Sequence, residues 1–215
     1  MEETLMTKNT NIIYLVNFTN PLKYEPWYDF ERSRPYPTRY SETKYGFGGR
    51  IDLGNRQMVF TCERVKTAAD ELRLELYDGL RGAPTFFIFF SEALIEHCFS
   101  HLIDKDIQIL PCELRAGNGV IKGFYWVEII NNVHGADHER STYSKYTGFL
   151  DKLVPKNEDF MQGHEIARED EMGSRIYIVP SLRERILKFK KKPRGFQILT
   201  PKQYWEYWRT INEPY

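Results

Sequence analysis

The chain has 215 residues with 30 basic and 30 acidic side chains, so its formal net charge is zero. That balance argues against a general nucleic-acid-binding protein, which carries a basic excess. No apolar run approaches the length of a membrane span, and residues 1–10 lack the basic region and apolar core of a signal peptide. We therefore expect a cytoplasmic protein that binds neither membranes nor nucleic acid. Its length suffices to bury a core without disulfides or metal.

The three cysteines, Cys62, Cys98 and Cys112, are an odd number without tight spacing. Such a set is neither a disulfide framework nor a zinc site, so we expect small buried thiols. The 14 Phe, 14 Tyr and 4 Trp residues supply large rings for the core. Some of the Tyr and Trp side chains would also suit a partner surface, where these types are enriched.

The N-terminal part, residues 1–83, combines strands with an irregular excursion. Residues 11–18 and 57–64 are rich in β-formers and predict two strands. Between them, prolines, glycines and aromatics in residues 23–49 predict a long loop, a feature that is often functional. Residues 72–76 alternate apolar and charged, which favours a half-buried strand, although the composition also suits a helix turn. We expect this part to pack on the same body as residues 84–215.

The second part begins with a run, residues 86–90, that is apolar at every position. This pattern is typical of a central strand covered on both faces. Ser91 can cap a helix that continues to residue 103 with one buried face. Residues 107–114 and 123–132 then predict two strands joined in a hairpin across the glycine-rich turn at residues 117–119.

The C-terminal third repeats this order of elements. A strand over residues 175–179 precedes a helix from Pro180 to Phe189, a strand over 195–199 and a last helix over 201–208. The same series therefore occurs twice, at residues 88–111 and at residues 178–201. In each case a strand is followed by a serine, a helix, the dipeptide Ile-Leu and a proline. These recurring strand–helix–strand units predict an α+β fold with a mixed, mainly antiparallel sheet and a few packed helices.

Two histidine pairs deserve a chemical interpretation. His97 and His101 are four apart on the predicted helix, but no Glu follows His97, so we interpret them as structural. His134 and His138 have the same spacing beside Asp137 and Glu139. This cluster suits a metal or general-base site, or equally a loop whose polar groups cap the neighbouring backbone.

Motifs for nucleotide or nucleophile chemistry are absent from the sequence. There is no Gly-x-Ser-x-Gly elbow, and the glycines at 46–49 lack the Lys-Ser/Thr of a phosphate loop. We therefore predict no cofactor.

The order of motifs from residue 107 onward is familiar. The strand at 107–114, a Gly-rich turn, the strand at 125–133 and the run Asp137-x-Glu139-Arg140-Ser141 resemble a bacterial family of polymorphic-toxin immunity proteins. That family was formerly a domain of unknown function and is typified by a Myxococcus member. Residues 176–198 are similar to its closing strand–helix–strand unit. The resemblance covers roughly residues 84–200, and the N-terminal third matches only loosely.

The resemblance implies a non-enzymatic inhibitor that binds a cognate toxin domain in the cytoplasm, often over its active site. We expect the contacts on the excursion at 27–45 and the loop at 137–146. The predicted toxin-binding residues are aromatic or acidic: Trp27, Tyr28, Tyr36, Asp137, Glu139 and Tyr143. The alternative function is a small metal-assisted hydrolase that uses the cluster from His134 to Glu139.

Overall fold

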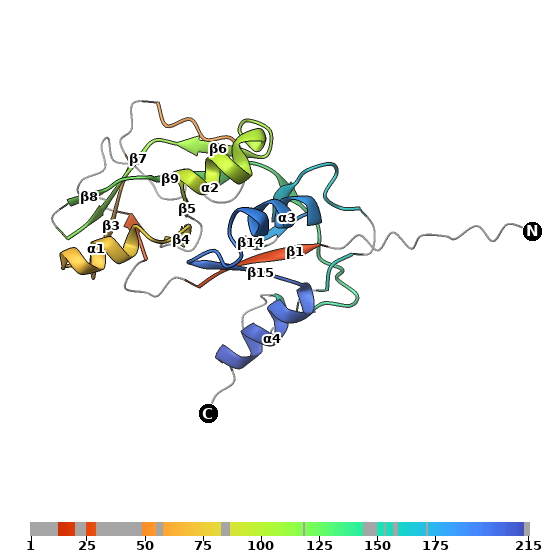
Figure 1. The fold of residues 1–215 in the computed structure, drawn as a ribbon. Helices are drawn as coiled ribbons and strands as arrows, with labels where there is room; N and C mark the ends of the chain where they lie inside the picture. The colour runs from red at the N-terminus through yellow and green to blue at the C-terminus, as the bar shows by residue number, and fades with distance from the viewer. Residues whose placement is uncertain are drawn as a thin grey trace, which may run out of the picture.

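The fold, shown in Figure 1, consists of three larger sheets with helices packed on them. The computed structural model describes most of the chain, with gaps: residues 13–19, 25–28, 49–54, 58–82, 87–117, 119–143, 150–152, 154–156, 159–170 and 172–212. Strands pair in mixed and antiparallel fashion, so the α+β class predicted from the sequence is confirmed.

The central sheet contains β5 (Ile88–Ser91), in which the first three residues are buried. The order of this sheet is β4 (Gly79–Arg81), β5, β9 (Phe124–Ile129) and β6 (Ile107–Leu110), with antiparallel pairing throughout. Along β5, Phe89 belongs to one core cluster, whereas Ile88 and Phe90 belong to another. The strand is thus covered on both faces, as its continuous apolar run predicted.

One face of the central sheet packs against a second sheet, which we call the outer sheet. Its order is β2 (Trp27–Tyr28), β3 (Met58–Cys62), β7 (Cys112–Ala116) and β8 (Gly119–Ile121). The pair β3–β7 is parallel, and the other two pairs are antiparallel. Phe60 of β3 contacts Phe89 and Trp126 of the central sheet edge to face, with ring centroids 4.8 and 5.8 Å apart.

The single strand predicted over residues 107–114 is wrong, because the chain changes sheets at Pro111. Residues before it form β6 in the central sheet, and residues after it form β7 in the outer sheet. Proline has no N–H to donate to a ladder and fixes its own φ, which makes it a natural break between strands. The predicted hairpin is also reassigned: the turn after Ala116 joins β7 to β8, while β9 pairs with β5 and β6.

The third sheet brings the two ends of the chain together. Its order is β10 (Asn132–Val133), β13 (Ile166–Glu169), β14 (Met172–Ile178), β1 (Tyr14–Phe18) and β15 (Phe196–Leu199). In Figure 1 the N-terminal β1 lies between the C-terminal β14 and β15. The last helix, α4 (Pro201–Asn212), packs on this sheet through the buried Tyr204. A separate two-stranded ribbon joins β11 (Thr142–Tyr143) and β12 (Leu150–Lys152).

The helices of the two strand–helix–strand units share one core. Ser91 caps α2 (Glu92–Leu94), which continues as a π-helical turn, η3 (Ile95–Phe99), and a 3-10 turn, η4 (Ser100–Leu102). The second unit contains α3 (Pro180–Phe189). Buried side chains of both helices belong to one core cluster, which also contains Phe90 and Phe196.

The recurring units have the same topology as well as the same order. In the first, β5 and β6 flank β9, and in the second, β14 and β15 flank β1. Each central strand is antiparallel to both neighbours. Strands from before residue 84 also pair with strands from after it, namely β1 with β14 and β15, β3 with β7 and β4 with β5.

The strand predicted over residues 72–76 is wrong, and a helix, α1 (Ala68–Leu74), covers most of it. Thr67 begins this helix: its Oγ1 accepts a hydrogen bond from the Asp70 N–H (3.2 Å) and donates one to Asp70 Oδ2 (2.8 Å). A cap of this kind satisfies donors that a strand would leave to a neighbour. Leu74 is buried but Leu72 is exposed, so the alternation does not mark a half-buried face.

Candidate functional site

A row of four residues crosses the outer sheet on the face that points away from the core. Trp27 in β2 lies opposite Thr61 in β3, Thr61 lies beside Arg115 in β7, and Arg115 lies opposite Val120 in β8. Partners on neighbouring strands point to the same face of a sheet. Phe60, the neighbour of Thr61 along β3, points the other way and is fully buried.

This face has large apolar groups at both edges and charge in the middle. Trp27 is 52% exposed and Val120 is 49% exposed. Between them, Arg115 Nε forms an ion pair with Glu113 Oε1 of the same strand. Tryptophan and arginine are the side chains that most often carry binding energy in protein interfaces. The arrangement therefore has the chemistry of a protein-binding surface.

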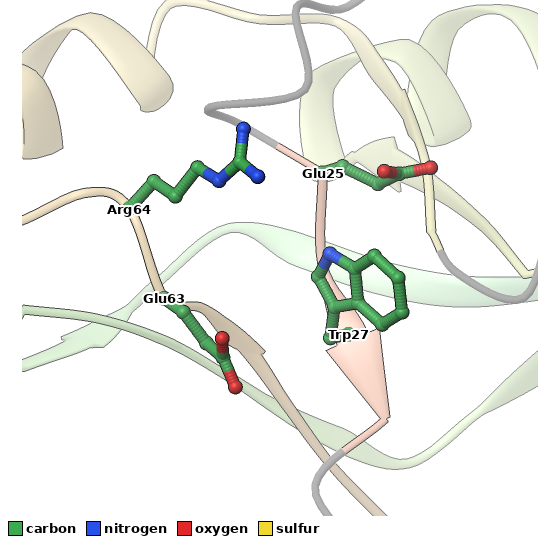
Figure 2. Close-up of a pocket in the computed structure, with 4 residues that line it drawn as sticks. All are labelled: Glu25, Trp27, Glu63 and Arg64. Carbon is green, nitrogen blue, oxygen red and sulfur yellow. The ribbon is translucent and has the colours of Figure 1, made fainter.

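A cleft of about 150 Å³ opens beside Trp27 and is lined by Glu25, Trp27, Glu63 and Arg64. Glu25 precedes β2, whereas Glu63 and Arg64 follow β3, so the cleft lies at the end of this antiparallel pair. Figure 2 shows Glu63 and Arg64 to the left of the Trp27 indole and Glu25 above it.

Glu25 is the unusual member of this cleft. Its exposed fraction is only 9%, yet no residue in the described part of the chain donates a hydrogen bond to its carboxylate or forms an ion pair with it. The pKa of the nearby Cys62 thiol is raised to about 12, mainly by burial and also by the negative charge of Glu25. Glu25 therefore brings a carboxylate to the lining of the cleft that has no ion-pair partner among the described residues.

The prediction of buried thiols is confirmed for Cys62 and Cys98, whereas Cys112 is only partly buried. None of the three forms a disulfide. Burial raises the pKa of Cys98 and that of Cys112 to about 11. The thiols are therefore protonated at neutral pH and are poor nucleophiles.

The structure distributes the predicted toxin-binding residues over separate places. Trp27 is exposed on the outer-sheet face, and Tyr28 follows it in β2, opposite Phe60. Tyr143 lies in β11, opposite Leu150. Tyr36 lies outside the described residues, as do most of the excursion at 27–45 and residues 144–149 of the second predicted segment.

Asp137 forms hydrogen bonds within its own turn. Its Oδ1 accepts from the N–H groups of Glu139 and Arg140, each at 3.1 Å, and its Oδ2 accepts from Arg140 Nε at 2.6 Å. The hydrogen bond from the Arg140 side chain is the main reason that the pKa of Asp137 lies below its ordinary value. This geometry is that of a loop whose polar groups cap the neighbouring backbone. Glu139 is exposed in the same turn.

The histidines take part in separate contacts. His134 Nε2 lies 3.6 Å from Asp170 Oδ2, and His101 Nε2 lies 3.1 Å from Glu165 Oε1. The His97 ring stacks on Phe189 with centroids 4.6 Å apart. Within the described ranges, no group of three or more His, Cys, Asp or Glu side chains is placed to hold a metal ion.

Sequence reasoning missed the residues that surround Trp27. Glu25 stands two positions before it, and Glu63 and Arg64 directly follow a predicted strand. Arg115 and Glu113 alternate with buried positions along β7, a period-two signal that was present in the sequence. That signal identifies a half-exposed strand but not the neighbour beside it.

Comparisons with known proteins add no relative: no family model matches the chain, and no curated protein matches it. In the described part of the chain, no helix has both the length and the apolar character needed to cross a membrane.

Proposed function

We propose that this protein is a non-catalytic immunity protein that binds and neutralises a cognate bacterial toxin domain. The observation that carries the proposal is the half-exposed Trp27 on the edge strand of the outer sheet, in one row with Arg115 and Val120. The resemblance of residues 84–200 to immunity proteins supports the choice of partner class. We assign the outer-sheet face as the contact surface.

The area of the outer-sheet face determines how much of the interface it can supply. The longest strands, β3 and β7, have five residues each and span about 17 Å, whereas β2 has two residues and β8 has three. With strands about 4.8 Å apart, the face presents less than about 240 Å². A stable interface needs about 800 Å² from each partner. The outer-sheet face is therefore the central anchor, and the partner must also contact neighbouring segments. Central anchors carry most of the binding energy and the surrounding contacts exclude water.

The test pairs this chain with a toxin domain encoded beside its gene. The toxin is expressed in a sensitive bacterium with or without this protein, growth is followed, and the dissociation constant is measured with an inactive toxin. A tagged copy recovered from the native cells, analysed by mass spectrometry, identifies the toxin domain beforehand. Wild-type protein should restore growth and bind at near-equal amounts.

The variant Trp27→Ala tests whether the toxin binds at the outer-sheet face. Loss of a hot-spot side chain costs about 2 kcal/mol or more, which weakens binding about 30-fold. Tyr125→Ala is the matched control, because Tyr125 is a 37% exposed aromatic on β9, outside the outer sheet. If the two variants bind the toxin equally well, the outer-sheet face is not the interface. Failure of the wild-type protein to bind or neutralise any neighbouring toxin would refute the immunity function itself.

A further inference from the structure

We propose that the cleft beside Trp27 is a receptor for one cationic side chain, a lysine or arginine, of the protein partner. The identity of that partner rests on the proposed function, but the chemistry of the cleft does not. Three features of the described residues lead to this assignment: the unpaired carboxylate of the largely buried Glu25, the formal charge of the lining, and the exposed indole.

The carboxylate of Glu25 is the starting point. The residue is 9% exposed, it lines the cleft, and no described residue forms an ion pair or a hydrogen bond with its carboxylate. A buried charge is stabilised by an opposite charge that also donates hydrogen bonds. Ammonium and guanidinium groups do both. An incoming cation therefore gains from Glu25 without first displacing an internal partner.

The charges of the lining select a cation over an anion. Glu25 and Glu63 contribute two carboxylates, and Arg64 contributes one guanidinium, so the formal net charge of the cleft is −1. Within the described ranges, Arg64 forms no ion pair with either glutamate. One bound monovalent cation would bring the cleft to neutrality.

The indole selects an organic cation over a metal ion. The face of tryptophan attracts lysine and arginine heads more strongly than any other aromatic ring does. Calcium and magnesium ions prefer six or more oxygen ligands, and this cleft offers two carboxylates. A cavity of about 150 Å³ holds a benzene-sized group, which fits the end of one long side chain but not a folded segment.

The position of the cleft connects it to the outer-sheet face. Trp27 belongs both to the row that crosses the sheet and to the cleft lining. A partner seated on the sheet can therefore insert one side chain beside the indole. Such an arrangement places a charged hydrogen-bonding group at the centre of the interface, where exclusion of water strengthens it.

The first arm of the test uses no toxin. N-acetyl-arginine amide is titrated into the full-length protein, and the indole N–H signal of Trp27, assigned with Trp27→Phe, is followed by NMR. N-acetyl-citrulline amide, the neutral analogue, is the control ligand. We expect a saturable shift with the arginine amide alone, and its loss in Glu25→Gln. Equal shifts with the two ligands would overturn the assignment of a cation site.

Substitution of Arg64 should change the affinity for the arginine amide in the opposite direction. Arg64→Gln changes the formal charge of the cleft from −1 to −2, so the arginine amide should bind several-fold more tightly than to the wild type. Weaker binding would mean that Arg64 helps to form the site and that the charge argument is wrong. Because this variant gains affinity, a folding defect cannot imitate the expected result.

The second arm uses the inactive toxin. Glu25→Gln and Glu63→Gln should each weaken binding about tenfold and reduce its salt dependence, whereas Glu184→Gln on α3 should leave both unchanged. If the toxin binds all variants equally, the cation site is wrong although the immunity function stands. If the arginine amide binds as expected but no toxin binds, the immunity function is wrong although the cation site stands.

Discussion

Cys98 and Arg185 each bond to the main chain of the other. Arg185 Nη1 donates to the carbonyl oxygen of Cys98 at 3.4 Å, and Cys98 Sγ donates to the carbonyl oxygen of Arg185 at 3.9 Å. The two residues come from the helices of the two recurring strand–helix–strand units. Their reciprocal contact therefore marks the place where the two units join.

Because each residue bonds to the main chain of the other, substitutions of the two should have additive effects on the free energy of unfolding. Cys98→Ala removes the bond from sulfur, and Arg185→Ala removes the bond from the guanidinium together with its contacts to His101 and Glu165. Neither variant removes the acceptor that the other residue uses. Each variant should lose about 1 kcal/mol of unfolding free energy. In a double-mutant cycle measured by urea unfolding, the coupling should stay below about 0.5 kcal/mol. A larger coupling would show that the side chains act on each other directly.

Tyr177 should protect the fold up to alkaline pH. Its hydroxyl donates to Glu169 Oε2 at 2.6 Å inside the core. Burial is the main cause that raises the pKa of Tyr177, and the charge of Glu169 raises it further. Because the folded state favours the neutral phenol, its contribution to stability is complete below the ordinary tyrosine pKa of about 10 and declines as pH rises above it.

Tyr177→Phe checks this. We expect a loss of about 1–3 kcal/mol at pH 7, since the buried Glu169 carboxylate loses a donor. The variant should also show a smaller further loss between pH 9 and 11 than the wild type, measured by urea unfolding. The same decline in both proteins would assign the alkaline sensitivity to other groups.

Asp137 should titrate below the ordinary aspartate range. Arg140 is the main cause of its lowered pKa, through the hydrogen bond to Oδ2. A folded-state pKa below the unfolded one means that the turn is stabilised above the ordinary value and loses that contribution as pH falls through the lowered pKa. Carboxyl-carbon NMR should show the midpoint move up in Arg140→Gln. An unchanged midpoint would assign the shift to the backbone donors.

Gly135 is required by packing. A Cβ atom there would lie 2.6 Å from the Phe160 ring and 2.8 Å from the Tyr177 ring. Gly135→Ala should cost about 1–3 kcal/mol because it overfills the core. Gly119→Ala is the matched control, since its nearest atom would be 4.0 Å away. Thermal unfolding measures both, and equal melting temperatures would contradict the packing requirement.

Several elements follow from local sequence alone. The run at 86–90, the Ser91 cap and the helix after Pro180 depend on residues within one turn or one strand of each other. The alternation at 72–76 misled because the Thr67 cap, five positions earlier, decides the conformation. The change of sheet at Pro111 was not predicted, because an apolar pattern identifies a strand but does not show which sheet that strand joins.

The candidate site was harder to predict than the fold, for a physical reason. Trp27 was predicted as a surface aromatic from its residue type. The roles of Arg115 and Val120 depend on the pairing of β2, β3, β7 and β8, which come from distant parts of the chain. Strand neighbours that are remote in sequence cannot be derived from a local pattern.

The placement of β1 has a consequence for synthesis on the ribosome. β1 ends at Phe18, but its partners β14 and β15 begin at Met172 and Phe196. Translation at about 5–20 residues per second leaves roughly 8–30 s between them. During that interval the nascent chain exposes a β-forming segment with both edges unpaired, which is a template for aggregation. We therefore expect β1 to be a binding segment for chaperones that hold extended apolar chains.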